Sequence, residues 1–259
     1  MHNIESGPII VNPTISIPKD KACLFDLLKR RKNEDETVPC LLNARNVRRI
    51  ANRTYYKGCM YEGEYDKNGV PNGAGSIRSA FSSFMGNVVN GVRQGKGIIL
   101  AGNETYEGNF ENDLYHGQGK LTIADGGVYE GEFFEGKFKG KGKFTWNDGT
   151  IYEGDFLDDT SHGKGELRFL DGKRYIGDFV KNFPQGKGIL IFSNGLECRG
   201  YFCLGKFHGK GRIFYPNGDI YDGEIDDGKR HGIGSLISVT KRFEGIWKDD
   251  SPLNGIYKA

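Results

Sequence analysis

One short signature recurs along most of this chain at a nearly constant spacing. It reads YEGEY from residue 61, YEGNF from 106, YEGEF from 129 and YEGDF from 152, and more divergent copies begin at residues 84, 175, 198, 221 and 243. Successive copies start 22 or 23 residues apart, and a second signature, typified by HGKG, lies inside each one. A fixed period of this length is the mark of a repeat architecture in which every repeat is one small supersecondary unit.

Each repeat has the pattern of two short strands. We number a repeat from its leading aromatic residue, so that Tyr152, Gly154 and Phe156 occupy positions 0, 2 and 4, with polar residues between them. This period of two is typical of a strand with one apolar face. The repeat continues as Gly-x-Gly-x-apolar-x-apolar and ends at an Asp-Gly or Asn-Gly pair such as Asp148-Gly149. Because such pairs favour tight turns, each repeat is predicted to be a β-hairpin.

The glycines inside the strands need an explanation, because glycine there costs about 0.5–1 kcal/mol of backbone entropy. We expect position 4 to face position 13, which would put Gly154 opposite Leu167 and Gly165 opposite Phe156. In that register a large side chain on one strand covers the gap left by glycine on its neighbour. The composition is consistent with aromatic strands joined by many turns, since the 259 residues include 40 Gly, 13 Tyr and 17 Phe.

The pattern YEGxF, followed by HGKG and a closing Asp-Gly, resembles the MORN (membrane occupation and recognition nexus) repeat, and the resemblance covers residues 57–259. It implies an all-β fold, an elongated, twisted, single-layer array of consecutive antiparallel β-hairpins. About eight full hairpins and a partial ninth are expected. In such an array each hairpin contacts only its neighbours, so stability is a sum of nearest-neighbour interfaces.

Residues 1–56 form a separate basic segment. They contain ten Lys or Arg and six Asp or Glu, a net charge of +4, whereas the whole chain has +2. An extended stretch comes first, and a helix is then predicted from Pro18 through KDKACLFDLLKRRK, which spaces its leucines on one face and ends in basic residues. A second, weaker helix is predicted over Leu41–Ala51.

Two roles are open for this segment. Its helices would cover the first, otherwise open, edge of the sheet. Alternatively, it is a basic anchor for an anionic membrane, or a nuclear import signal. The lipid contacts would then be Lys29, Arg30, Arg31, Lys32, Arg48 and Arg49.

No constellation in the sequence points to catalysis, a metal or a cofactor. Four histidines occupy the same position of different repeats and are interpreted as turn residues: His116, His162, His208 and His231. Successive repeats should be about 10 Å apart, too far for the roughly 2 Å ligand distances of zinc. The recurring carboxylates at position 1 predict a solvated charge ladder. Since acids flank the aromatic rows, no nucleic acid partner is expected. Because no catalytic constellation is present, the chain is predicted not to be an enzyme.

Cysteine usage and hydropathy bear on the compartment. The five cysteines include no CxxC pair, which fits a reducing environment. Neither a signal peptide nor an apolar run of about 18 residues is present, so we expect a cytoplasmic protein. The resemblance extends this expectation to the cytoskeleton or a cilium.

The resemblance also implies a scaffold or adaptor function. We expect a groove of aromatic and glycine residues to bind a helix or peptide of a partner protein, or a second copy of the chain. The alternative is a peripheral membrane adaptor that binds anionic phospholipids through the basic segment. A third reading is a regulatory part of a separate enzyme. The candidate groove residues are Tyr106, Phe110, Tyr129, Phe133, Trp146, Tyr152, Phe156, Phe169, Tyr175 and Phe179.

Overall fold

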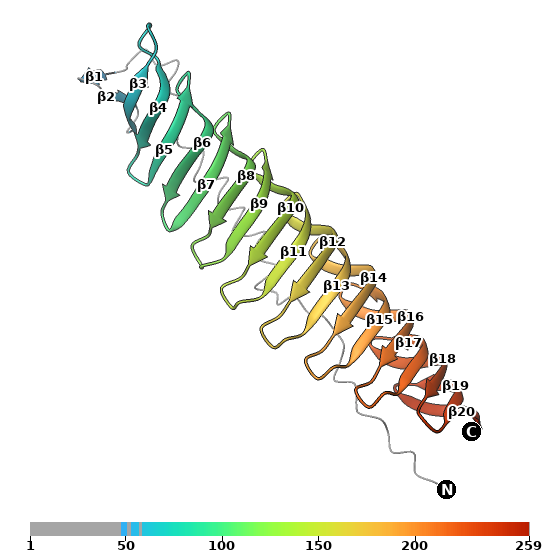
Figure 1. Ribbon diagram of the computed structural model, residues 1–259. Coiled ribbons are helices and arrows are strands. Elements are labelled where there is room, and N and C mark those ends of the chain that lie inside the picture. Colours follow the sequence, from blue (N-terminus) through green and yellow to red (C-terminus); the bar gives the residue numbers. More distant parts are fainter. Residues whose placement is uncertain (1–47, 51–52, 57–58, 259) are drawn as a thin grey trace. The chain divides into compact units, whose positions relative to one another are not determined.

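The computed structural model describes residues 48–50, 53–56 and 59–258, and every element of regular structure in these ranges is a β-strand (Figure 1). The chain divides between Thr160 and Ser161 into two compact units, called here the N-terminal unit and the C-terminal unit. Each unit is an antiparallel sheet in which strands that follow one another in the chain are paired neighbours. The predicted all-β class and the hairpin repeats are therefore confirmed.

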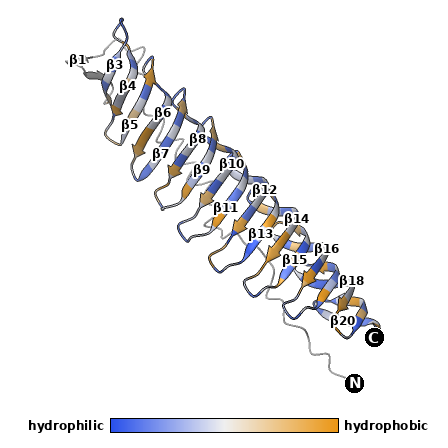
Figure 2. Cartoon of the chain, viewed as in Figure 1, coloured by the Kyte–Doolittle hydropathy of each residue, from blue (hydrophilic) through white to orange (hydrophobic). Residues whose placement is uncertain are grey.

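The N-terminal unit contains β1 (Arg48–Ile50), β2 (Arg53–Tyr56), β3 (Cys59–Tyr65), β4 (Pro71–Arg78), β5 (Ser82–Val89), β6 (Val92–Ala101), β7 (Glu104–Glu111), β8 (Leu114–Thr122), β9 (Val128–Phe134), β10 (Lys137–Thr145) and β11 (Ile151–Leu157). The C-terminal unit contains β12 (Thr160–Arg168), whose first residue lies on the boundary, β13 (Arg174–Val180), β14 (Phe183–Ile191), β15 (Glu197–Cys203), β16 (Lys206–Phe214), β17 (Ile220–Asp226), β18 (Lys229–Ile237), β19 (Arg242–Lys248) and β20 (Ser251–Lys258). Figure 2 shows hydrophobic residues recurring along the strands of both units.

The predicted register is wrong, because glycine faces glycine. Position 2 pairs with position 13, as in Gly108 opposite Gly119 on β7 and β8. Position 4 pairs with position 9, which brings Phe110 opposite Tyr115. The second strand begins at position 8, earlier than the sequence pattern indicated, and a bulge then shifts the pairing. The two glycines used for the prediction also have glycine neighbours: Gly154 faces Gly142, and Gly165 faces Gly177.

An aromatic ring fills the gap above each glycine pair, but it comes from the same strand. A methyl group added to Gly119 would lie 2.6 Å from Cε2 and Oη of Tyr106, and one added to Gly108 would meet the same ring. The Tyr106 hydroxyl extends past the pair and donates a hydrogen bond of 2.7 Å to the backbone carbonyl of Asn109. Five further tyrosines at position 0 donate the same bond: Tyr61, Tyr129, Tyr152, Tyr175 and Tyr221.

These rings form the core of each unit. Tyr106 stacks on Tyr115 of its own repeat, with ring centroids 3.8 Å apart, and meets Phe133 of the next repeat edge-on at 5.0 Å. In the C-terminal unit, Tyr175 makes the equivalent contact with Phe202 of the following repeat at 4.9 Å. Edge-to-face pairs of this kind add about 0.5–1.5 kcal/mol beyond the area that they bury. In these repeats a ring from the next repeat therefore completes the core.

Two kinds of turn connect the strands. Within a repeat the turn has two left-handed residues, such as Asn112 (φ 50°) and Asp113 (φ 68°), a conformation that matches the twist of paired strands. Between repeats the turn is at the predicted Asp-Gly pair: the N–H of Gly149 donates to the carbonyl of Trp146 at 3.0 Å. The turn signal in the sequence therefore marks the junction between repeats.

A bulge in the second strand explains the acidic residues at position 3. Gly186 has φ 82°, and the bulge leaves the N–H of Lys187 facing Asp178, whose carboxylate accepts it at 3.2 Å. Glu132 and Glu224 accept the corresponding N–H groups of Lys141 and Ile233. These carboxylates therefore satisfy backbone donors that the ladder cannot reach.

The four repeated histidines lie in strands, so their interpretation as turn residues is wrong. They precede the bulge glycine by one residue, in β8, β12, β16 and β18. His116 and His208 each lie 3.2 Å from a carboxylate, of Glu111 and Asp226 respectively.

The predicted N-terminal helices fall mostly outside the described residues. Where they overlap, the prediction is wrong: Arg48–Ile50 is strand β1, which pairs with β2, with Arg49 opposite Thr54. Pairing with a neighbouring strand overrides a weak local helical pattern. The boundary at residue 57 stays a prediction, although β2, which precedes it, also pairs with β3.

The first test concerns the buried phenol. Tyr129→Phe removes the 2.9 Å hydrogen bond to the carbonyl of Glu132 and leaves that acceptor unsatisfied. We expect the free energy of unfolding to fall by about 1–2 kcal/mol, measured by urea denaturation. The control is Tyr201→Phe, at a tyrosine that is 48 % exposed, where no change is expected. Equal effects of the two substitutions would show that the bond contributes nothing.

The second test uses pH. Burial raises the pKa of five tyrosines at position 0, that of Tyr61 to about 12; the other four are Tyr106, Tyr129, Tyr175 and Tyr221. The unfolded phenol has a pKa of about 10, so stability from these groups is complete below about pH 10 and is lost as the pH rises through the folded-state values. Urea midpoints should therefore be constant near neutral pH and fall above about pH 10. A midpoint that stays unchanged up to about pH 12 would contradict this.

Candidate partner-binding surface

The predicted aromatic groove is filled by its own side chains. Eight of its ten residues belong to positions 0 and 4 and are at most 5 % exposed. They are Tyr106, Phe110, Tyr129, Phe133, Tyr152, Phe156, Tyr175 and Phe179. Trp146 and Phe169 are half-buried and adjoin the turns between repeats. A partner could reach these two, whereas contact with the other eight would require the core to open.

Most of the predicted lipid contacts lie outside the part of the chain that the structure describes. Lys29, Arg30, Arg31 and Lys32 lie outside the described ranges, and Arg48 and Arg49 belong to strand β1. Anionic lipid binding by the basic segment stays a prediction.

The face opposite the core, called here the outer face, carries positions 1, 3, 12 and 14. From β7 to β11 its central row alternates in charge, because each residue faces one of opposite sign on the next strand. Lys120 Nζ lies 2.8 Å from Glu130, and this contact lowers the pKa of the carboxyl and raises that of the amine. The row consists of Glu107, Lys120, Glu130, Lys143 and Glu153. The predicted charge ladder is therefore present here, and its exposed pairs contribute little stability each.

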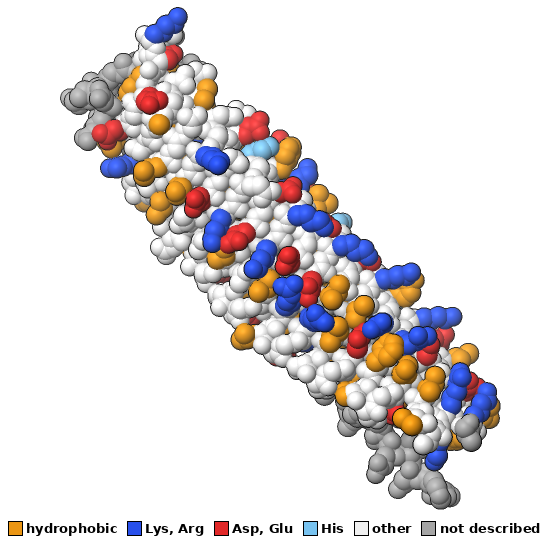
Figure 3. Space-filling model, in the orientation of Figure 1, with side chains coloured by type: hydrophobic (Ala, Val, Ile, Leu, Met, Phe, Trp, Pro, Cys, Tyr) orange, Lys and Arg blue, Asp and Glu red, His pale blue; other side chains and the backbone are white. Residues whose placement is uncertain are grey.

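At some outer-face positions apolar residues replace charged ones. In the N-terminal unit Met85 lies opposite Ile98, and both are exposed. In the C-terminal unit such pairs recur. Ile176 lies opposite Ile189, and Ile233 lies opposite Ile246. Figure 3 shows hydrophobic side chains gathered among Lys and Arg over this part of the chain. The most exposed of the isoleucines is Ile233, at 73 %. This apolar surface lies outside the core of the unit.

The repeat that begins at Cys198 closes its core in another way. Cysteine replaces the tyrosine at position 0, and the ring over the glycine pair comes from Phe207 at position 9. A methyl group on Gly200 would lie 2.9 Å from Cε2 of Phe207, and one on Gly211 would also meet that ring. Burial raises the pKa of the Cys198 thiol to about 12. The fold therefore requires a ring over the glycines, whichever position supplies it.

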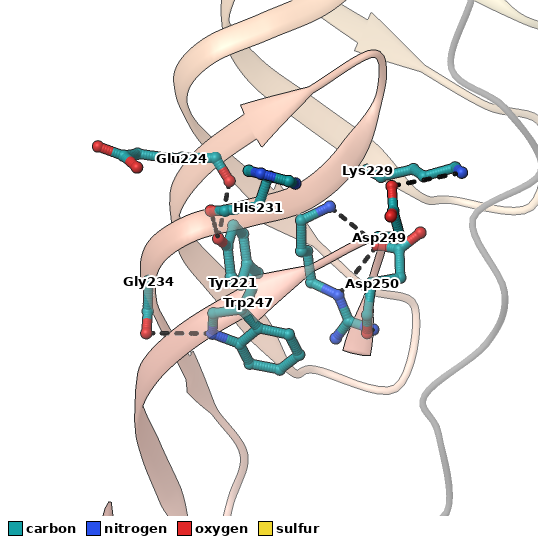
Figure 4. A network of polar contacts seen from close by, with 9 residues as sticks. Tyr221, Glu224, Lys229, His231, Gly234, Trp247, Asp249 and Asp250 are labelled. Carbon is teal, nitrogen blue, oxygen red and sulfur yellow. Dashed lines mark hydrogen bonds and ion pairs between the residues drawn. The ribbon is translucent and has the colours of Figure 1, made fainter. Parts of the chain in front are cut away.

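Two buried arginines also occupy position 9, and each is bound by the following repeat. Arg230 is 5 % exposed, and both its backbone N–H and its Nε donate to Oδ1 of Asp250, at 2.9 and 3.2 Å. Its guanidinium carbon lies 4.4 Å from the ring centroid of Trp247, and Figure 4 shows Trp247 and Asp250 in this network. Arg93 and Asp113 repeat the arrangement. Because each carboxylate comes from the next repeat, we assign these pairs to holding repeats in register.

Over the described ranges, no group of three or more His, Cys, Asp or Glu side chains is placed to hold a metal ion. In the same part of the chain, no helix has the length and apolar character needed to cross a membrane.

Comparison with known proteins identifies the repeats. The family model described as MORN repeat matches the chain eight times in succession. The matched segments are residues 61–80, 84–103, 106–128, 129–151, 152–174, 175–197, 198–220 and 221–240. The chain belongs to the MORN repeat family. A search of curated proteins gives no match to it.

Solved structures with some likeness to this MORN-repeat chain include TCP domains of CPAP proteins. A single-substitution variant of the TCP10 domain of Danio rerio CPAP has a TM-score of 0.42 and 14% identity, over 78% of this chain and 93% of that one. The SAS-4 (dCPAP) TCP domain of Drosophila melanogaster, in complex with a proline-rich motif of Ana2, has a TM-score of 0.35 and 12% identity, over 50% of this chain and 73% of that one. At these TM-scores the likeness carries no conclusion about this chain.

The sequence contains a signal for the two buried arginines and for Phe207, which we did not predict. Both buried arginines stand at position 9, where three other repeats have Tyr or Phe, and both have Asp 20 residues later. Likewise, the one repeat that lacks an aromatic residue at position 0 has Phe207 at position 9. What the sequence could not show is that position 9 lies on the core face, because the bulge interrupts the alternation.

The third test exchanges the source of the ring. Phe207→Ala should uncover Gly200 and Gly211 and lower the free energy of unfolding by about 3–5 kcal/mol. Adding Cys198→Tyr should restore much of this loss, because the new ring would cover the glycines as tyrosines at position 0 do in other repeats. Cys198→Tyr alone should change the stability little, because a ring at position 9 can stack on one at position 0, as in two other repeats. Urea denaturation measures all three variants. Additive effects of the two substitutions would contradict the exchange.

Proposed function

We propose that this MORN-repeat chain is a non-catalytic scaffold that binds a protein partner, or a second copy of itself, on its sheet. The outer face of the C-terminal unit carries this proposal. Ile176, Tyr201, Ile233 and Ile246 are exposed there, although the core of the unit is complete without them. They form two groups, Ile176 with Tyr201 and Ile233 with Ile246. Exposed apolar groups bordered by polar residues mark interaction sites.

The electrostatics of the described residues favour binding over catalysis. The thiol of Cys198, with a pKa raised by burial to about 12, is a poor nucleophile at neutral pH. The carboxyl groups of Glu166 and Glu244 have lowered pKa values because Arg168 and Lys258, respectively, donate hydrogen bonds to them on the surface. Groups held ionised in surface ion pairs are not tuned for proton transfer near pH 7.

Within this proposal the scaffold acts in the cytoplasm, as part of a cytoskeletal, ciliary or membrane-skeleton assembly. Membership of the MORN repeat family is the main support for that setting. Cys59, Cys198 and Cys203 are free thiols, which is consistent with a reducing compartment.

The experiment is affinity capture with the full chain as bait, followed by quantitative mass spectrometry, together with light scattering of the purified chain. We expect either a partner retained in stoichiometric amount or a defined homo-oligomer. An unrelated bait of similar net charge is the control. A purified chain that is monomeric and retains no stoichiometric partner would overturn the proposal.

A further inference from the structure

Three apolar side chains come together on the outer face of β13, β14 and β15. Ile176 lies directly opposite Ile189. Tyr201 is two residues from Arg199, which faces Ile189, so it lies diagonal to that isoleucine. Facing and diagonal residues on a sheet are within reach of one another. These three residues, with Lys187 and Lys210 beside them, are called here the Tyr201 patch.

Lys187 has lost the acidic partner that its equivalents have. In two other repeats, the lysine at position 12 reaches the carboxylate at position 3 of the next repeat: Lys141 Nζ lies 2.6 Å from Asp155, and Lys164 Nζ lies 2.5 Å from Asp178. Tyr201 stands where the next carboxylate would be, and Lys187 Nζ lies 5.8 Å from its ring centroid. Among the described residues, neither Lys187 nor Lys210 forms an ion pair.

The carboxylates nearest to the patch are already engaged. Asp178 is paired with Lys164, and Glu166 with Arg168 at 2.7 Å. Glu197 is paired with Arg199. Glu224 of β17 faces Lys210 in the register, but its carboxylate accepts the N–H of Ile233 at 3.1 Å. The patch therefore combines apolar surface with two lysines that form no ion pair among the described residues.

The core does not account for Tyr201. In its repeat Phe207 covers the glycine pair, and the Tyr201 side chain is 48 % exposed on the opposite face. The bulge at Gly209 forms in this repeat without a carboxylate at position 3. Folding therefore does not require a tyrosine at this position, because an acidic residue would serve equally well.

From this complementarity we infer that the Tyr201 patch binds an acidic amphipathic helix of a partner protein, an inference that rests on the proposed scaffold function. Lys187 and Lys210 lie on β14 and β16, two strand spacings apart, or about 10 Å. Carboxylates at positions i and i+7 of an α-helix are separated by about 10.5 Å along its axis. A helix that crosses the strands would set those carboxylates over the two lysines and its apolar side chains at i+3 and i+4 over Tyr201 and Ile189.

The test measures binding of the full chain to two labelled helical peptides by fluorescence anisotropy. One peptide carries Glu at i and i+7 with Leu at i+3 and i+4, and the other carries Lys in place of Glu. We expect the Glu peptide to bind about tenfold more tightly, and Lys187→Glu to reverse this preference, a shift of about 1.4 kcal/mol or more. The matched control is Lys141→Glu, an equivalent charge reversal in the N-terminal unit, which should leave both affinities unchanged.

Both variants should remain folded, with free energies of unfolding within about 1 kcal/mol of the wild type, because both lysines are exposed and the surface ion pair that Lys141→Glu removes contributes little. Equal binding of the two peptides, no binding of either, or equal effects of Lys187→Glu and Lys141→Glu would overturn the inference. The inference would also be overturned if neither peptide binds and Lys187→Glu instead abolishes binding to anionic vesicles or self-association. If the captured partner binds the Lys187→Glu variant normally, the scaffold function stands and this site is wrong.

Discussion

An aromatic ring lying across two facing glycines is the contact on which each repeat depends. The absence of a Cβ atom on both strands lets the ring approach the backbone, and where the ring is a tyrosine its hydroxyl donates to a backbone carbonyl. The ring and one of its glycines belong to the same strand, so each repeat carries most of its own cover. In several repeats a Phe or Trp from the next repeat packs edge-on against it, which couples neighbours within each unit.

The two faces of the sheet are therefore under different sequence constraints. The core face holds the rings, and its composition is constrained at positions 0, 2, 4, 9, 13 and 15. The outer face is released from that constraint, apart from the carboxylates at position 3 that satisfy the bulge. From β7 to β11 the outer face carries a charge ladder, whereas the C-terminal unit carries isoleucines and Tyr201 among its ion pairs. The recurrence of these exposed apolar residues is the basis for assigning partner binding to the C-terminal unit.

The period, the hairpins and the strand faces could be predicted because they depend on local alternation and turn chemistry. The register could not, because the residues at position 9, among them Tyr115, Arg230 and Phe207, share no chemistry that marks a strand. The bulge at position 11 then moves the pairing, so glycine meets glycine. The alternation also showed which rings share a face, but not that they lie flat on the backbone. For that reason eight of the proposed groove residues form the core, and the exposed outer face went unnoticed.

A double-mutant cycle between Tyr106 and Gly119 tests most directly whether the ring over the glycines holds the fold together. In the wild type, Gly119→Ala places a methyl group against the ring and should cost about 1–3 kcal/mol of unfolding free energy. In a Tyr106→Leu background that collision is relieved, so the same substitution should cost much less, or stabilise by about 0.5–1 kcal/mol through reduced backbone entropy. A coupling energy above about 1 kcal/mol is the expected result. Additive costs would contradict it, because the methyl group on Gly119 would then be insensitive to the ring.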